Sequence, residues 1–95
     1  MKKAYLVNTE DSLPVIIHAE SRNIARYQHW EKLSFYFDHD YIKIKAVRKP
    51  EMDTQPATWA NISTASGYKF EGESDDEFSL MICGCEICLD KLRRM

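Results

Sequence analysis

Three cysteines lie close together in the sequence, and they are the residues with the clearest capacity for chemistry. Cys83, Cys85 and Cys88 stand in the segment CGCEIC. Cys85 and Cys88 form a C-x-x-C pair at the expected start of a helix, where the helix dipole and unpaired N–H groups lower the pKa of a thiol. Cysteines at this spacing are typical ligands of a structural zinc ion, which takes four ligands in a tetrahedral arrangement.

A zinc ion at these cysteines would need a fourth ligand, because the sequence contains no further cysteine. The candidates are His18, His29, His39 or a residue of a second chain, as in a homodimer. Two other interpretations remain open. The cysteines could be ordinary small buried residues, or Cys85 and Cys88 could be a redox pair. We therefore expect either one zinc ion or no cofactor.

The sequence lacks the common catalytic motifs. Its histidines do not have the H-E-x-x-H spacing, no serine stands in a G-x-S-x-G setting, and neither type of glycine-rich phosphate loop occurs. A single histidine on a helix, such as His29, is expected to face solvent. The sequence therefore predicts a protein that is not an enzyme.

The charge is unevenly distributed along the chain. Residues 1–49 carry a net charge of +3 and residues 50–95 a net charge of −5, which gives −2 in total. An acidic run in the second half is either a solvated loop or a docking surface for a basic partner. Its acids are Glu71, Glu73, Asp75, Asp76 and Glu77.

A second candidate partner surface is the basic face of a predicted strand, formed by Tyr41, Lys43 and Lys45. Aromatic and basic residues on a sheet can stack on bases and neutralise phosphates, but lysines also protect the edge of a sheet from pairing. We expect a protein partner, with nucleic acid as the alternative. A membrane is not expected, because a membrane span needs ~20 apolar residues and the apolar runs here are much shorter.

The elements that must position these residues follow from the periodicity of the apolar side chains. Strands are predicted at 3–9 and 13–20, joined into a hairpin by a polar turn, and at 41–49, where Ile44 and Ala46 face one way. Ser21 is the expected N-cap of an amphipathic helix that packs on this sheet. Its apolar stripe comprises Ile24, Tyr27, Trp30, Leu33 and Phe37.

The second half of the chain is less regular. Segment 51–66 has no periodicity and is expected to be a loop. Two short strands are predicted at 68–70 and 78–82, across the acidic run, and a short helix at 86–94. The expected fold is a single α+β domain over residues 1–95, with a β-β-α-β core at 1–50 and a hairpin plus a cysteine-bearing helix at 67–95.

The segments AESRNIARYQHW and IKIKAVRKPEMD resemble a group of small uncharacterised phage and prophage proteins. In that group a zinc-ribbon-like tail with two cysteine pairs often follows. This chain has the second pair, Cys85 and Cys88, and YKFE at 68–71 where the first would be expected. The resemblance implies an accessory protein of the bacterial cytoplasm. We expect it to act by binding a host or viral macromolecule, with a small zinc- or nucleic-acid-binding module as the alternative.

Overall fold

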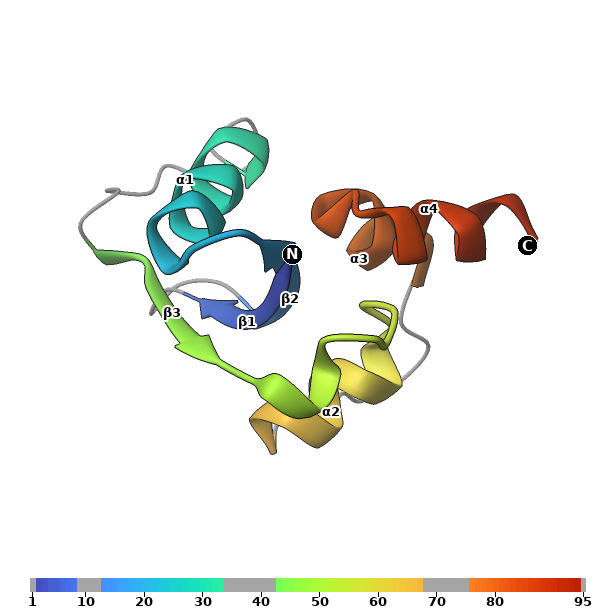
Figure 1. Ribbon diagram of the computed structural model, residues 1–95, viewed down its shortest axis with the longest axis horizontal. Coiled ribbons are helices and arrows are strands. Elements are labelled where there is room, and N and C mark those ends of the chain that lie inside the picture. Colours follow the sequence, from blue (N-terminus) through green and yellow to red (C-terminus); the bar gives the residue numbers. More distant parts are fainter. Residues whose placement is uncertain (1, 9–12, 34–42, 68–75, 95) are drawn as a thin grey trace.

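The chain combines a small antiparallel sheet with helices, as the α+β prediction requires. The computed structural model describes residues 2–8, 13–33, 43–67 and 76–94 (Figure 1). The strands are β1 (Lys3–Asn8), β2 (Val15–Ala19) and β3 (Lys45–Arg48). The helices are α1 (Arg22–Leu33), the short 3-10 helix η2 (Pro50–Met52), α2 (Trp59–Ser66), α3 (Asp76–Cys83) and α4 (Glu86–Arg93). The α+β class is confirmed.

A three-stranded antiparallel sheet lies at the centre, with β1 between β2 and β3. The predicted hairpin is present, because β1 pairs with β2 along its length. Near β3, Ile44 and Ala46 are buried whereas Lys43 and Lys45 are exposed. The predicted alternation of this strand is therefore confirmed for its described residues.

Different elements cover the two faces of the sheet (Figure 1). α1 packs on one face, where Val7 and Ile17 are fully buried. On the other face, Ile16 packs with residues of η2, α2 and α4. α3 lies along β2 and contributes to both cores, Ile82 to the first and Leu80 to the second. All five residues of β2 are consequently buried, although β2 is an edge strand.

α1 turns a different side to the sheet from the one predicted. Ser21 is its N-cap as expected, because Ser21 Oγ accepts a hydrogen bond from the Ile24 N–H at 3.2 Å. However, Ile24 and Tyr27 are 47% and 52% exposed, so these two residues of the predicted apolar stripe are not sheltered by the sheet, whereas Trp30 is partly buried against the core. Ala25 and His29 are fully buried instead. The prediction that His29 faces solvent is therefore wrong.

α1 also makes a polar contact with α3. Gln28 Nε2 donates to the Cys83 carbonyl at 2.6 Å, and Lys32 Nζ donates to the Met81 carbonyl at 3.2 Å. These side chains satisfy carbonyl groups at the end of α3 that have no partner within the helix. Trp30 is partly buried against the core under α1.

α2 occupies part of the segment that was predicted as a loop. Thr58 Oγ1 accepts a hydrogen bond from the Asn61 N–H at 3.3 Å and caps the start of the helix. Gly67 ends it with a φ of +74°, a left-handed conformation that favours glycine. Capping at both ends and the buried Ile62 stabilise a helix with little apolar periodicity.

α3 replaces the predicted strand at 78–82, and the predicted second hairpin is therefore wrong. A five-residue run with four apolar side chains fits a strand or a buried helix equally well. Asp76 and Glu77 in the first turn favour the helix, since acidic side chains stabilise the positive end of its dipole. α4 confirms the predicted helix at 86–94 to within one residue.

Some predictions lie outside the described residues. They concern the turn at 10–12, the end of the first helix with Phe37, and the strand at 68–70. Within the described residues, no helix combines the length and the apolar character needed to cross a bilayer.

Candidate metal centre

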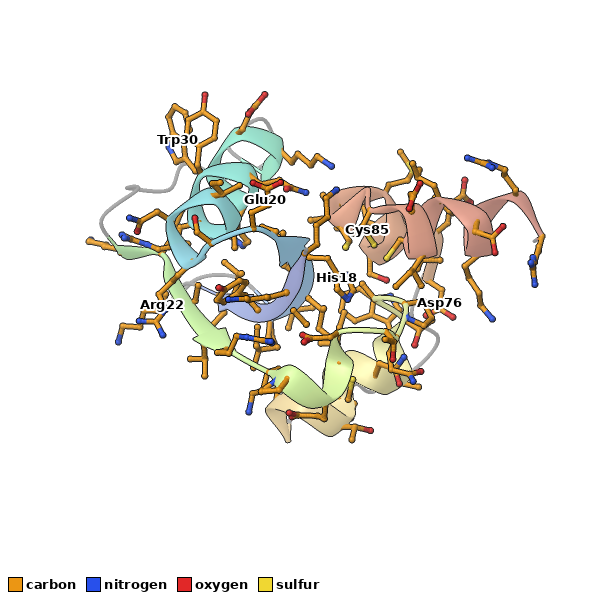
Figure 2. All side chains as sticks on the ribbon, in the orientation of Figure 1. His18, Glu20, Arg22, Trp30, Asp76 and Cys85 are labelled. Atoms are coloured by element: carbon orange, nitrogen blue, oxygen red, sulfur yellow. The ribbon has the colours of Figure 1, made fainter. Side chains whose placement is uncertain are left out.

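Four side chains from separate parts of the chain converge between the sheet and the C-terminal helices. Cys83 is the last residue of α3, Cys85 is the N-cap of α4, and Cys88 follows in the first turn of α4. The fourth is His18 of β2. Figure 2 shows His18 reaching from the sheet toward Cys85. The three Sγ atoms and a ring nitrogen of His18 all lie within 4.8 Å of one another, and all four residues are buried.

These positions match what a tetrahedral zinc ion requires. With Zn–S of about 2.3 Å and Zn–N of about 2.0 Å, neighbouring sulfur and nitrogen ligands are about 3.5 Å apart. His18 Nδ1 lies 3.1 Å from Cys83 Sγ and 3.3 Å from Cys85 Sγ. These two separations are slightly shorter than those around zinc, and all four ligand atoms lie within 4.8 Å of one another, so a small adjustment would let them surround one ion.

A backbone carbonyl fixes the orientation of the His18 ring. His18 Nε2 lies 2.8 Å from the Met52 carbonyl oxygen, which can only accept, so Nε2 carries a hydrogen. In the neutral ring, the lone pair is then on Nδ1, which faces the sulfurs. Histidine ligands of metals commonly donate their other ring N–H to a carbonyl in this way.

Each sulfur also receives a backbone N–H. The His18 N–H donates to Cys83 Sγ at 3.4 Å, the Cys88 N–H to Cys85 Sγ at 3.4 Å, and the Ala57 N–H to Cys88 Sγ at 3.3 Å. Hydrogen bonds from N–H groups stabilise a sulfur that carries negative charge. The surroundings of the group are thus suited to thiolates.

The close contacts within the group shift the pKa values of His18, Cys85 and Cys88. Burial lowers the pKa of His18, but hydrogen bonds with Cys83 and Cys85 outweigh burial and raise the pKa to about 10. Hydrogen bonds with Cys83 and Cys88 lower the pKa of Cys85. Hydrogen bonds with Cys83 and Cys85 raise the pKa of Cys88. A bound cation would replace the protons, because zinc binds thiolates and neutral imidazole.

Gly84 allows the two helices to bring their cysteines together. Its φ of +63° turns the chain sharply between Cys83 and Cys85. A Cβ atom at this position would lie 2.6 Å from Lys32 Nζ, the atom that donates to the Met81 carbonyl. Glycine is therefore favoured here for its conformation, whereas a Cβ atom would only require the flexible end of the Lys32 side chain to move.

Of the three histidines considered as a fourth ligand, the structure brings His18 to the cysteines. His29 is buried on α1 and is not part of the group, and His39 lies outside the described residues. The alternation of β2 places His18 on the same face as Ile16, which the sequence could indicate. The sequence does not reveal that this face meets the C-terminal helices.

The structure describes only part of the two predicted partner surfaces. Glu71, Glu73, Asp75 and Tyr41 lie outside the described residues. Asp76 has a role within the fold, since its Oδ1 accepts the Trp59 N–H at 2.9 Å at the start of α2 (Figure 2). Glu77 is exposed on the first turn of α3, and Lys43 and Lys45 are exposed near β3.

Comparison with protein-family models, with curated proteins and with solved structures finds no match to this chain. The β-β-α-β order and the cysteine cluster agree with the pattern on which the phage resemblance rests. The phage origin itself stays a prediction.

Proposed function

We propose that the protein is a zinc-binding module in which Cys83, Cys85, Cys88 and His18 hold one structural zinc ion. The observation that carries this proposal is the convergence of four buried donor atoms within 4.8 Å. The ion would join β2 to α3 and α4, because its ligands come from all three elements.

The donor set favours zinc over other common cations. Calcium and magnesium prefer oxygen ligands, whereas three thiolates and one imidazole are typical of structural zinc sites. A catalytic zinc ion usually keeps one position for water or substrate. Here the protein supplies four ligands that are at most 3% exposed, which favours a structural ion and a protein without enzymatic activity.

The zinc proposal also accounts for the cysteines better than a redox pair does. A disulfide between Cys85 and Cys88 would leave Cys83 and the oriented ring of His18 without a role. Buried thiols without a metal would not need an oriented imidazole or an N–H donor for every sulfur. Because the zinc ion would have a structural role, we infer that the protein acts through its surface, by binding a macromolecule.

Metal analysis of the purified full-length chain tests the proposal. We expect about one zinc ion per chain, and cobalt substitution should give the thiolate-to-cobalt absorption of a tetrahedral site. The Cys88→Ser and His18→Ala variants should lose most of the metal. His29→Gln is the matched control, because His29 is equally buried but outside the group.

The control separates ligation from stability. His29→Gln should keep its zinc even if the variant is less stable. If the wild-type protein contains no metal and a chelator leaves its unfolding unchanged, the proposal is wrong. If His29→Gln loses zinc and His18→Ala does not, His18 is not the fourth ligand.

A further inference from the structure

A basic pocket lies on the α1 side of the sheet, away from the metal centre. It has a volume of about 560 Å³ and is open to solvent at the end where β1 begins and β3 ends. Its lining comes from β1, from β3 and from the start of α1. The lining residues are Lys3, Tyr5, Ser21, Arg22, Asn23 and Arg48.

The charge of this pocket is strongly positive for a protein with a net charge of −2. Among the described residues that line it, Lys3, Arg22 and Arg48 are cationic and none is acidic. Glu20 precedes the start of α1, but Figure 2 shows it well separated from Arg22. The first turn of α1 contains no acid, so the positive end of its dipole adds to the field.

Arg48 is held in place before any ligand binds. Its guanidinium group donates to both carboxylate oxygens of Asp53 at 2.6 and 2.7 Å and to the Ala4 carbonyl at 3.2 Å. It also lies over the Tyr5 ring, 5.8 Å from the centroid. Asp53 balances one positive charge but does not line the pocket. Lys3 and Arg22, both exposed, supply the remaining positive charge.

We propose that this pocket binds the phosphate groups of a nucleotide, either free or within a single-stranded nucleic acid. Cations from three elements surround one opening, and arginine and lysine are the side chains that recognise phosphate. The volume exceeds that of one phosphate ion, so the pocket has room for the attached sugar. Ser21 Oγ accepts the Ile24 N–H and can donate its own hydrogen to such a ligand.

This site is independent of the zinc proposal and differs from the basic strand face of the sequence analysis. Tyr5 belongs to the core under α1, whereas the cysteines belong to the core on the other face. Lys45 alternates with Ala46 and therefore points away from α1. The pocket is thus a second basic surface, on the opposite side of the sheet from Lys45.

Fluorescence anisotropy with a labelled single-stranded oligonucleotide tests the proposal on the zinc-loaded full-length protein. The double variant Lys3→Ala/Arg22→Ala removes two cations without disturbing the Arg48–Asp53 pair. The control, Lys91→Ala/Arg93→Ala, removes two exposed cations from α4 and gives the same net charge. We expect about tenfold weaker binding for the pocket variant, little change for the control, and a shallower dependence on salt for the pocket variant only.

Competition with a mononucleotide and with inorganic phosphate distinguishes the sources of the phosphate. Displacement of the oligonucleotide by the mononucleotide supports a free nucleotide as ligand. Binding of the oligonucleotide alone, with the same loss in the pocket variant, supports a nucleic-acid strand. Equal weakening in both double variants, or no binding of any probe at low salt, would overturn the proposal.

Discussion

The backbone N–H and the ring Nδ1 of His18 both lie within 3.4 Å of Cys83 Sγ, although 65 residues separate the two in the chain. This N–H belongs to β2, an edge strand, and edge strands carry backbone groups that another strand could pair with. Cys83 therefore accepts a backbone N–H at the edge of the sheet and is also one of the four residues of the metal group. We infer that metal binding and the packing of α3 on the sheet are coupled.

Removal of zinc is expected to open the C-terminal helices before the sheet. A ligand that binds only the folded state adds about 1.4 kcal/mol of stability for each tenfold rise in its free concentration above the Kd. After chelation, the amides of residues 83–88 and of His18 should exchange with solvent much faster, whereas those of β1 should change little. Hydrogen exchange with and without chelator measures this difference. Equal acceleration in all strands and helices would contradict the coupling.

Replacement of Gly84 by alanine should weaken zinc binding as well as folding. The left-handed φ costs a non-glycine residue about 1–2 kcal/mol, and the new Cβ would also displace Lys32 Nζ from the Met81 carbonyl. Gly67→Ala is the matched control, because Gly67 has a similar φ of +74° but no atom within 4 Å of the added Cβ. Thermal unfolding and zinc affinity are measured for both variants.

The two glycine variants should differ in their effect on the metal. Both are expected to lower the free energy of unfolding, but only Gly84→Ala should lower zinc affinity, because Gly84 joins two ligands. An equal zinc affinity in the two variants would show that the turn at Gly84 does not position the cysteines.

The sequence could predict elements whose signals are local. Alternation identified the hairpin, and the spacing of Cys85 and Cys88 identified both the start of α4 and a candidate metal site. The position of His18 depends on which face of β2 meets α3. That contact is made by residues far apart in the sequence, and no local pattern reports it.

The errors have the same physical origin. In α1 the apolar residues Ile24 and Tyr27 suggested the buried side, but the helix buries Ala25 and His29 and places Gln28 at the end of α3. These contacts join residues that are far apart in the sequence, so the local periodicity does not report them. For α2, the decisive signals were the capping residues at its two ends, and they are weaker than periodicity in a segment that contains Pro56 and directly follows Pro50.

The ion pair between Asp53 and Arg48 is expected to make stability depend on pH in the acid range. Hydrogen bonds from Arg48 and from the Ala4 N–H lower the pKa of Asp53 from 3.8 to about 2. A carboxyl group whose pKa is lower in the folded state stabilises that state above its unfolded pKa. This contribution is lost as the pH falls through the folded pKa. The contribution of Asp53 to the free energy of unfolding is therefore constant near neutral pH and decreases from about pH 4 to pH 2.

The Asp53→Asn variant measures this contribution. The difference in free energy of unfolding between wild type and variant should be constant down to about pH 5 and become smaller below it. Comparison at equal pH removes the effect of metal loss, which both proteins share. Glu51→Gln, an exposed neighbour on η2, is the control and should differ little from wild type. A difference that does not change with pH would show that Asp53 ionises alike in the folded and unfolded chain.

The orientation of α1 can be tested by two substitutions at adjacent positions. Ala25 is fully buried against the sheet, so Ala25→Leu should lower the free energy of unfolding by about 1–3 kcal/mol through overpacking. Ile24 is 47% exposed, and Ile24→Ala should change it by about 0.5 kcal/mol or less. Alanine and leucine have similar helix propensities, so the first effect would report packing. Urea unfolding of the zinc-saturated proteins measures both values, and a larger loss for Ile24→Ala than for Ala25→Leu would mean that α1 faces the sheet with its apolar stripe after all.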